Sequence, residues 1–243
     1  MTKRFIPTIA IALLATSGCN LFDRAEARDA GRAVDRSYQV AAFDRIEVAG
    51  PYEVTVKTGG TPGVTARGGE TLLAETDFVV ENGVLRIKPK KRNGIRWNFG
   101  DDGKVTVAVT TAALRGAAIG GSGGVRIDRV AGGEFKGKIG GSGDLSIDAV
   151  DAELVELAVA GSGEIRAAGK TQKLDLSIAG SGDVDVSGLE AATADVSIAG
   201  SGNVRARATA TADVSIMGSG DVELTGGAKC NVSKHGSGDV RCS

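Results

Sequence analysis

The chain has 243 residues, of which 37 are glycine and only 4% are aromatic. This composition disfavours a large mixed core and suits thin layers filled with Val, Ile, Leu and Ala. The 29 Lys and Arg residues and the 30 Asp and Glu residues leave a formal net charge of −1, which provides no basic field for nucleic acid, so we expect no nucleic-acid partner.

Residues 1–18 are typical of a targeting segment rather than of folded structure. Two basic residues stand at positions 3 and 4, residues 5–16 are mostly apolar, and small residues lead to Cys19. The apolar run is too short to span a bilayer as a stable helix. The segment resembles a bacterial lipoprotein signal peptide, which implies lipid modification of Cys19, and Asn20 after it implies delivery to the outer membrane. An ordinary secretory signal cleaved nearby is the alternative.

Residues 19–37 are charged and poor in large apolar side chains, which predicts a tether to a folded domain of residues 38–243. In residues 38–115, short alternating runs are separated by Gly-Gly, Pro-Gly and Asn-Gly turn signals. The strands predicted there cover residues 43–48, 52–57, 64–66, 78–81, 84–88 and 105–110. Residues 70–76 are compatible with one short helical turn. We expect this part to continue and cap the core of the following repeats.

Residues 116–243 contain seven copies of Gly-Ser-Gly at intervals of 20, 20, 19, 20, 18 and 18 residues. The copies begin at Gly121, Gly141, Gly161, Gly180, Gly200, Gly218 and Gly236. Apolar residues alternate on both sides of each copy, which is the period of a strand. Every unit carries the same corner with the same flanks in the same order, so coils stacked in parallel explain the pattern better than an antiparallel meander. The predicted fold class is an all-β, single-stranded parallel β-helix-like solenoid with about 18–20 residues per coil.

Stacking would turn equivalent residues of the repeats into ladders, and it would place Val184, Val204 and Val222 in one interior row. Three positions after the second glycine the column reads Arg126, Ser146, Arg166, Asp185, Arg205, Glu223 and Arg241. Its last five members alternate in sign, which we interpret as control of register. Five positions before the first glycine stand Glu156, Asp175, Asp195 and Asp213. Nearby lysines, Lys170 or Lys173, would relieve the repulsion in this acidic column, and a weakly bound divalent cation is the alternative.

Assigning Cys19 to lipid leaves Cys230 and Cys242, an even pair in a compartment that oxidises thiols. Both occupy core-facing columns of the last repeat. We therefore predict a disulfide that closes the terminal coil, where a free strand edge would otherwise invite association. Two buried free thiols are the alternative.

Motifs for catalysis or metal binding are weak. Ser122 lies in a Gly-Gly-Ser-Gly-Gly stretch that matches G-x-S-x-G by letter, but the only histidine, His235, lies six repeats away. Residues 140–144 approach the calcium nonapeptide, although the aspartate comes one residue early and the period is about twice too long. We expect no catalytic residues, no metal site and no cofactor.

A family resemblance rests on three strand sequences and on the repeat. They are Phe43–Val48, Pro51–Val56 and Val84–Lys88, followed by recurrent Gly-Ser-Gly-Asp-Val. Together they resemble the head GIN domain, a family described as autotransporter adhesins, over residues 38–243. The resemblance implies a right-handed β-helix-like fold behind a lipoprotein or secretory signal, and it supplies no catalytic residues. The chain departs from the family at Thr111–Leu114, where a proline before the leucine is common.

The leading functional prediction is a non-enzymatic lipoprotein of the bacterial cell envelope, delivered to the outer membrane. Its membrane contact is the N-terminal lipid, and its laddered faces would meet a glycan or a protein of the envelope. One alternative is a polysaccharide-active enzyme with paired carboxylates such as Asp175 and Asp195. Against it, the repeats contain a single aromatic residue, Phe135. A purely structural envelope protein is the other alternative.

Overall fold

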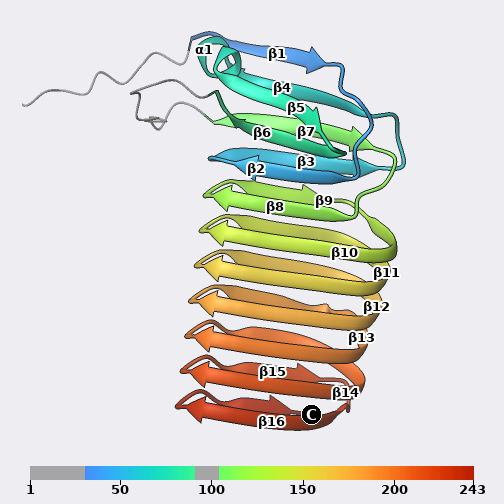
Figure 1. Cartoon of the computed structure of the whole chain (residues 1–243), viewed down its shortest axis with the longest axis vertical. Coiled ribbons are helices and arrows are strands. Elements are labelled where there is room, and N and C mark those ends of the chain that lie inside the picture. Colours follow the sequence, from blue (N-terminus) through green and yellow to red (C-terminus); the bar gives the residue numbers. More distant parts are fainter. Residues whose placement is uncertain (1–30, 91–103) are drawn as a thin grey trace, which may run out of the picture.

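The computed structural model describes residues 31–90 and 104–243, so Cys19 and the predicted signal segment lie outside the described residues. The chain winds into flat coils that are stacked along the long axis of the molecule (Figure 1). One short helix lies near the N-terminal end of the stack. Within the described ranges, no helix has the length and apolar character needed to cross a membrane.

The elements before the repeats are β1 (Ala33–Tyr38), β2 (Arg45–Ala49), β3 (Tyr52–Thr58), β4 (Gly63–Gly69), α1 (Glu70–Ala74), β5 (Thr76–Glu81), β6 (Val84–Pro89) and β7 (Val105–Thr111). The elements of the repeats are β8 (Gly116–Gly121), β9 (Gly124–Ile127), β10 (Val130–Gly141), β11 (Asp144–Gly161), β12 (Glu164–Gly180), β13 (Asp183–Gly200), β14 (Val204–Gly218), β15 (Val222–Thr225), β16 (Lys229–Gly236) and β17 (Val240–Cys242). In each coil from β11 to β14, one continuous strand bends around the molecule and contributes to both of its sides (Figure 1).

From β8 onward the coils stack in parallel and in chain order. Val184, Val204 and Val222 are paired on adjacent coils, and all three are buried. The predicted interior row is therefore confirmed, and with it the all-β, stacked parallel solenoid. Each coil crosses the molecule twice, once before its Gly-Ser-Gly corner and once after it (Figure 1).

The corner sequence follows from how closely consecutive coils approach. The first glycine of every copy has φ between +122° and +140°, a region that side chains with a Cβ rarely adopt. A Cβ on any of the second glycines would come within 2.5 Å of an atom of the adjacent coil. The serine between them is exposed, and in most copies its backbone N–H donates to the first glycine of the preceding coil, as from Ser142 to Gly121 O at 2.9 Å.

The strands predicted between residues 43 and 111 are all present, but their coils are not stacked in chain order. β2 and β3 form one coil around a corner at Gly50. β6 and β7 pair with one edge of this coil and β8 and β9 with the other, always in parallel. The coil of β6 and β7, although second along the chain, is therefore stacked on the N-terminal side of the coil of β2 and β3. The repeat pattern did not indicate this arrangement.

A short crossing, anchored by the buried side chains of Thr111 and Leu114, makes this order possible. Between β7 and β8 the chain passes the coil formed by β2 and β3. The hydroxyl of Thr111, which is fully buried, donates to the carbonyl oxygen of Phe43 at 2.7 Å. The backbone N–H of Arg115 donates to the carbonyl oxygen of Asp44 at 2.7 Å. These bonds satisfy polar groups that the crossing removes from water.

The N-terminal end of the stack is covered by β1, β4, β5 and α1 (Figure 1). α1 falls within the short helical turn predicted for residues 70–76. The structure corrects the predicted tether of residues 19–37, because residues 33–37 belong to β1, which pairs antiparallel with β4. Val34 and Tyr38 of β1 pack against the core, which gives this edge strand its anchor.

The opposite end of the stack is closed by a disulfide between Cys230 and Cys242, whose Cα atoms are 6.6 Å apart. The predicted bridge is therefore present. Only Cys230 packs against the core, and Cys242 is exposed because no further coil covers it. Lys234, which occupies the column that holds isoleucine or valine in the other repeats, is exposed for the same reason.

Replacing both cysteines by serine is expected to lower the free energy of unfolding by about 3 kcal/mol, because the bridge closes a loop with a sequence separation of 12 residues. Chemical denaturation of the variant and of wild type, with and without reductant, measures the difference. Reduced wild-type protein serves as the control and should match the variant. Two reactive thiols at these positions in unreduced protein would contradict the prediction.

Candidate functional site

The solenoid has two broad outward faces. We call the outer side of the strands that follow each corner the ladder face; it comprises β9, β15, β17 and the first residues of β11 to β14. We call the outer side of the strands that precede each corner the smooth face; it comprises β8, β16 and the later residues of β10 to β14. The two faces carry different side chains.

The ladder face carries the predicted column of alternating charge. Asp185, Arg205 and Glu223 are paired on adjacent coils, with Arg166 above and Arg241 below them. Arg205 Nε lies 3.6 Å from Glu223 Oε2, and the two side chains are 66% and 59% exposed. Such exposed pairs contribute at most about 1 kcal/mol each. The column therefore guides register and leaves its charges available to solvent or to a ligand.

Beside this column runs a second ladder of acidic and amide side chains, one residue after each corner. Asp183 Oδ1 accepts hydrogen bonds from the backbone N–H and the side-chain amide of Asn203, at 3.1 and 2.9 Å. Asn203 in turn accepts from the backbone N–H of Asp221, and Asp221 from that of Asp239. Each side chain of this column thus accepts a hydrogen bond from the backbone of the next coil. Aligned repeats display this column directly, although from the sequence it was considered only as part of a calcium loop.

Between the two ladders lies a groove of about 480 Å³, lined by Glu164, Arg166, Asp185, Arg205, Glu223 and Arg241 among others. The side-chain hydroxyl of Ser187 donates to Asp185 Oδ1 at 2.7 Å, and this bond lowers the pKa of Asp185. The groove thus presents ionised groups of both signs at the spacing of the coils. Its chemistry suits a polar ligand that both donates and accepts hydrogen bonds.

The acidic column predicted on the other side of the coil is also present. Glu156, Asp175, Asp195 and Asp213 occupy equivalent positions of successive coils on the smooth face. Lys173 Nζ lies 3.0 Å from Asp175 Oδ1, and hydrogen bonding to Asp175 raises the pKa of this lysine. The lysine interpretation is therefore supported. Among residues 31–90 and 104–243, no group of His, Cys, Asp or Glu is arranged to hold a metal ion.

Next to the acidic column, the smooth face is a shallow trough of about 670 Å³ with a floor of small residues. The column directly before the corners holds Gly120, Gly140, Ala160, Ala179 and Ala199, which follow one another on successive coils. The next member of that column is Met217, whose side chain is 68% exposed. The repeat alignment contained this column, but only the structure shows that it forms one uncovered apolar surface.

Two residues singled out by catalytic motifs lie far apart in the stack. Ser122 is the exposed residue of the first Gly-Ser-Gly corner, and it leads into the strand β9 rather than into a helix. His235 lies in the terminal coil, paired with Met217 of the coil before it. The geometry that a nucleophile elbow requires is therefore missing at Ser122.

Comparisons with known proteins agree with this architecture. A crystal structure from Bacteroides fragilis, described as a putative adhesin, has a TM-score of 0.80 and 21% identity, covering 87% of this chain and 97% of that one. Two structures from Parabacteroides distasonis are also similar. One is described as a putative lipid binding protein (TM-score 0.67, 22% identity, 88% and 97% coverage). The other is described as a putative adhesin (TM-score 0.70, 20% identity, 88% and 98% coverage).

A comparison with curated proteins gives no match. The solved structures are too distant in sequence to show more than the fold. Residues 42–228, by contrast, match a family model over most of the chain. The protein therefore belongs to the family described as "Putative auto-transporter adhesin, head GIN domain".

Proposed function

We propose that the protein is a non-enzymatic binding protein of the bacterial cell envelope that holds a polar envelope component, glycan or protein, on its ladder face. The groove between the two charged ladders carries this proposal. Its arginine and carboxylate side chains are largely exposed and repeat at about 4.8 Å, so a ligand with a regular series of polar groups meets several of them at once. The family description and the relatives described as adhesins support a binding role.

Attachment through a lipid on Cys19, in the outer membrane, is part of the same proposal. Cys19 precedes β1 by 14 residues, and β1 lies at the capped end of the stack (Figure 1). A lipid at this position would keep the cap near the membrane and direct the repeats away from it. The ladder face would then run along the outward axis of the molecule, where an extended partner can reach it.

The test is co-sedimentation of the purified protein with isolated bacterial envelopes. Arg166 and Arg205 contribute positive charge to the groove. Replacing both by alanine is expected to weaken binding by at least about fivefold, the equivalent of ~1 kcal/mol. Arg67→Ala in the cap is the matched control, since Arg67 is also largely exposed and lies outside the groove. Its binding should equal that of wild type.

Treating the envelopes with protease beforehand separates the two classes of ligand. Binding that survives the treatment indicates a glycan, and binding that is lost indicates a protein. Equal binding by wild type, by the double variant and by the control would show that the ladder face is not the binding surface. Release of soluble sugar fragments during incubation would contradict the non-enzymatic part of the proposal.

A further inference from the structure

We propose that two copies of this chain associate through their smooth faces as an antiparallel dimer with two-fold symmetry. The trough on this face is lined mainly by apolar atoms over several coils and lies open, with Glu47 and Lys138 as its charged lining residues. A contiguous uncovered apolar surface on an otherwise polar molecule is typical of an interface. Met217, one of two exposed large hydrophobic residues in residues 31–90 and 104–243, projects from its end.

A two-fold axis in the plane of the smooth face, directed along the strands, fits the columns to one another. Rotation about such an axis reverses the order of the coils and places each column opposite the same column of the second copy. With the axis between Ala160 and Ala179, the partner's Ala199 lies opposite Gly140, and the partner's Met217 lies opposite Gly120. A Cβ added at Gly120 would meet nothing closer than 3.9 Å, so the large side chain lies opposite open space.

The same axis also matches the charges. The outward-facing column four residues earlier begins with Arg45, Gly116 and Lys136 and continues with Glu156 and the three aspartates of the acidic column. Its positive residues therefore lie at one end and its negative residues at the other. Reversal places Lys136 opposite the partner's Asp195. An antiparallel pair therefore attracts at both ends of this column.

The centre of this arrangement brings Glu156 opposite the partner's Asp175. Both carboxylates already have a lysine partner within their own chain. Lys136 Nζ lies 3.0 Å from Glu156 Oε2, and Lys173 Nζ lies 3.0 Å from Asp175 Oδ1. These lysines neutralise the charge at the centre, so complementarity at the two ends decides the orientation.

The dimer goes beyond the proposed function and does not depend on it. Its two caps lie at opposite ends of the particle, so the cap-to-membrane orientation proposed for a lipid-anchored chain applies to one copy of the pair. The ladder face lies on the opposite side of each coil, so association through the smooth faces leaves both ladder faces open and directed away from each other (Figure 1). Two grooves in one particle would raise the apparent affinity for a repetitive ligand through multivalency.

Sedimentation velocity of the purified protein over a range of concentrations tests the dimer. Ala179 is exposed in the middle of the trough, and Ala179→Arg is expected to weaken the dimer by at least about tenfold, because a charged side chain replaces a small one at the interface. Ala210→Arg is the matched control; Ala210 is exposed at the bend between the two sides of β14. It should dimerise like wild type.

A charge exchange tests the antiparallel register even if Ala179→Arg impairs folding. Lys136→Glu and Asp195→Lys should each weaken the dimer by about tenfold or more, since each creates two like-charge contacts. The double variant should recover a large part of the lost association, because it restores opposite charges at both ends while Glu156 loses its Lys136 partner at the centre. A wild-type protein that stays monomeric would overturn the proposal. This holds even if the trough then binds lipid vesicles or a different protein. A dimer that ignores Ala179→Arg, or a double variant without recovery, would overturn it as well.

Discussion

Replacing Gly200 by alanine is expected to lower the free energy of unfolding by more than about 3 kcal/mol. Gly200 has φ +140°, and a Cβ there would lie 2.1 Å from the carbonyl oxygen of Gly180 in the preceding coil. The alanine therefore combines a backbone conformation that costs on the order of 1 to 3 kcal/mol with a collision against backbone that cannot move aside. Because coils on both sides depend on the same spacing, relief by a local shift is small.

Gly140→Ala is the control for this prediction. Gly140 lies on the smooth face just before a corner, where the nearest atom to an added Cβ is 3.9 Å away. The equivalent residues of the following coils are Ala160 and Ala179. We expect a change of no more than about 0.5 kcal/mol. Urea denaturation of both variants measures the contrast, and equal stability of the two would refute the steric explanation of the corner.

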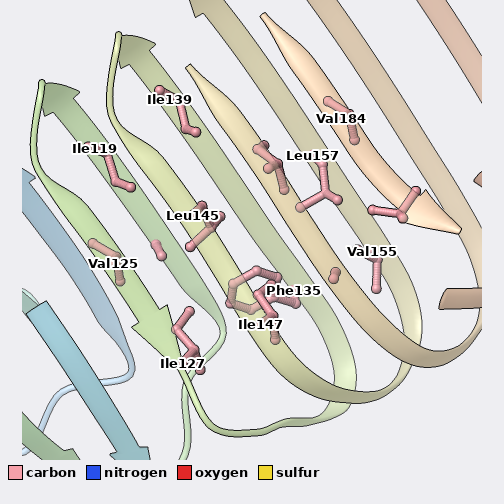
Figure 2. Close-up of a cluster of buried hydrophobic side chains, with 14 of the residues drawn as sticks. Ile119, Val125, Ile127, Phe135, Ile139, Leu145, Ile147, Val155, Leu157 and Val184 are labelled. Atoms are coloured by element: carbon pink, nitrogen blue, oxygen red, sulfur yellow. The ribbon is translucent and has the colours of Figure 1, made fainter. Parts of the chain in front are cut away.

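Replacing Phe135 by alanine is expected to lower the free energy of unfolding by about 3 to 5 kcal/mol, because its fully buried ring fills the interior of the coil to which β10 belongs. Figure 2 shows this ring among Ile147, Leu145 and Leu157. Its position is linked to Gly137, where an added Cβ would lie 2.7 Å from both leucines and 3.4 Å from the ring. The phenylalanine and the glycine together fill the volume that two aliphatic residues fill in other coils.

A double substitution tests this compensation. In the next coil, Val155 pairs with Phe135 and Leu157 pairs with Gly137. Phe135→Val alone should leave a cavity, and Gly137→Leu alone should overpack the core, whereas the two together should recover a large part of the stability. Thermal unfolding of the four proteins gives the coupling free energy. Strictly additive losses would show that the two positions do not share one space.

Much of the fold could be predicted because the same pattern of apolar residues and glycines occurs in every repeat. Alternation around each Gly-Ser-Gly specifies which side chains are buried, and the constant order of flanks specifies parallel stacking. Columns such as that of Arg205 and Glu223 can therefore be predicted as ladders from the sequence alone. The cysteine pair was accessible for the same reason, because Cys230 and Cys242 fall in core-facing columns of the terminal repeat.

The non-repetitive half was harder, because each of its elements occurs once. The strands were recognised from alternation and turn residues, but their order in space depends on contacts between distant segments. Val34 and Tyr38 in β1 are too few to indicate a strand, and only pairing with β4 makes the segment part of the fold. The position of Thr111 beside Phe43 likewise results from the crossing chain, for which the sequence carries no local signal.

The sequence by itself determined the solenoid, its core rows, the charged ladders and the terminal disulfide, because a short period forces equivalent residues into contact. The tertiary structure decided how the first coils are ordered, where the cap begins, and which ladders share a groove. It also decided that the small residues before each corner form a continuous trough that ends at Met217. These features depend on distances between coils and between faces, which a pattern along the chain does not contain.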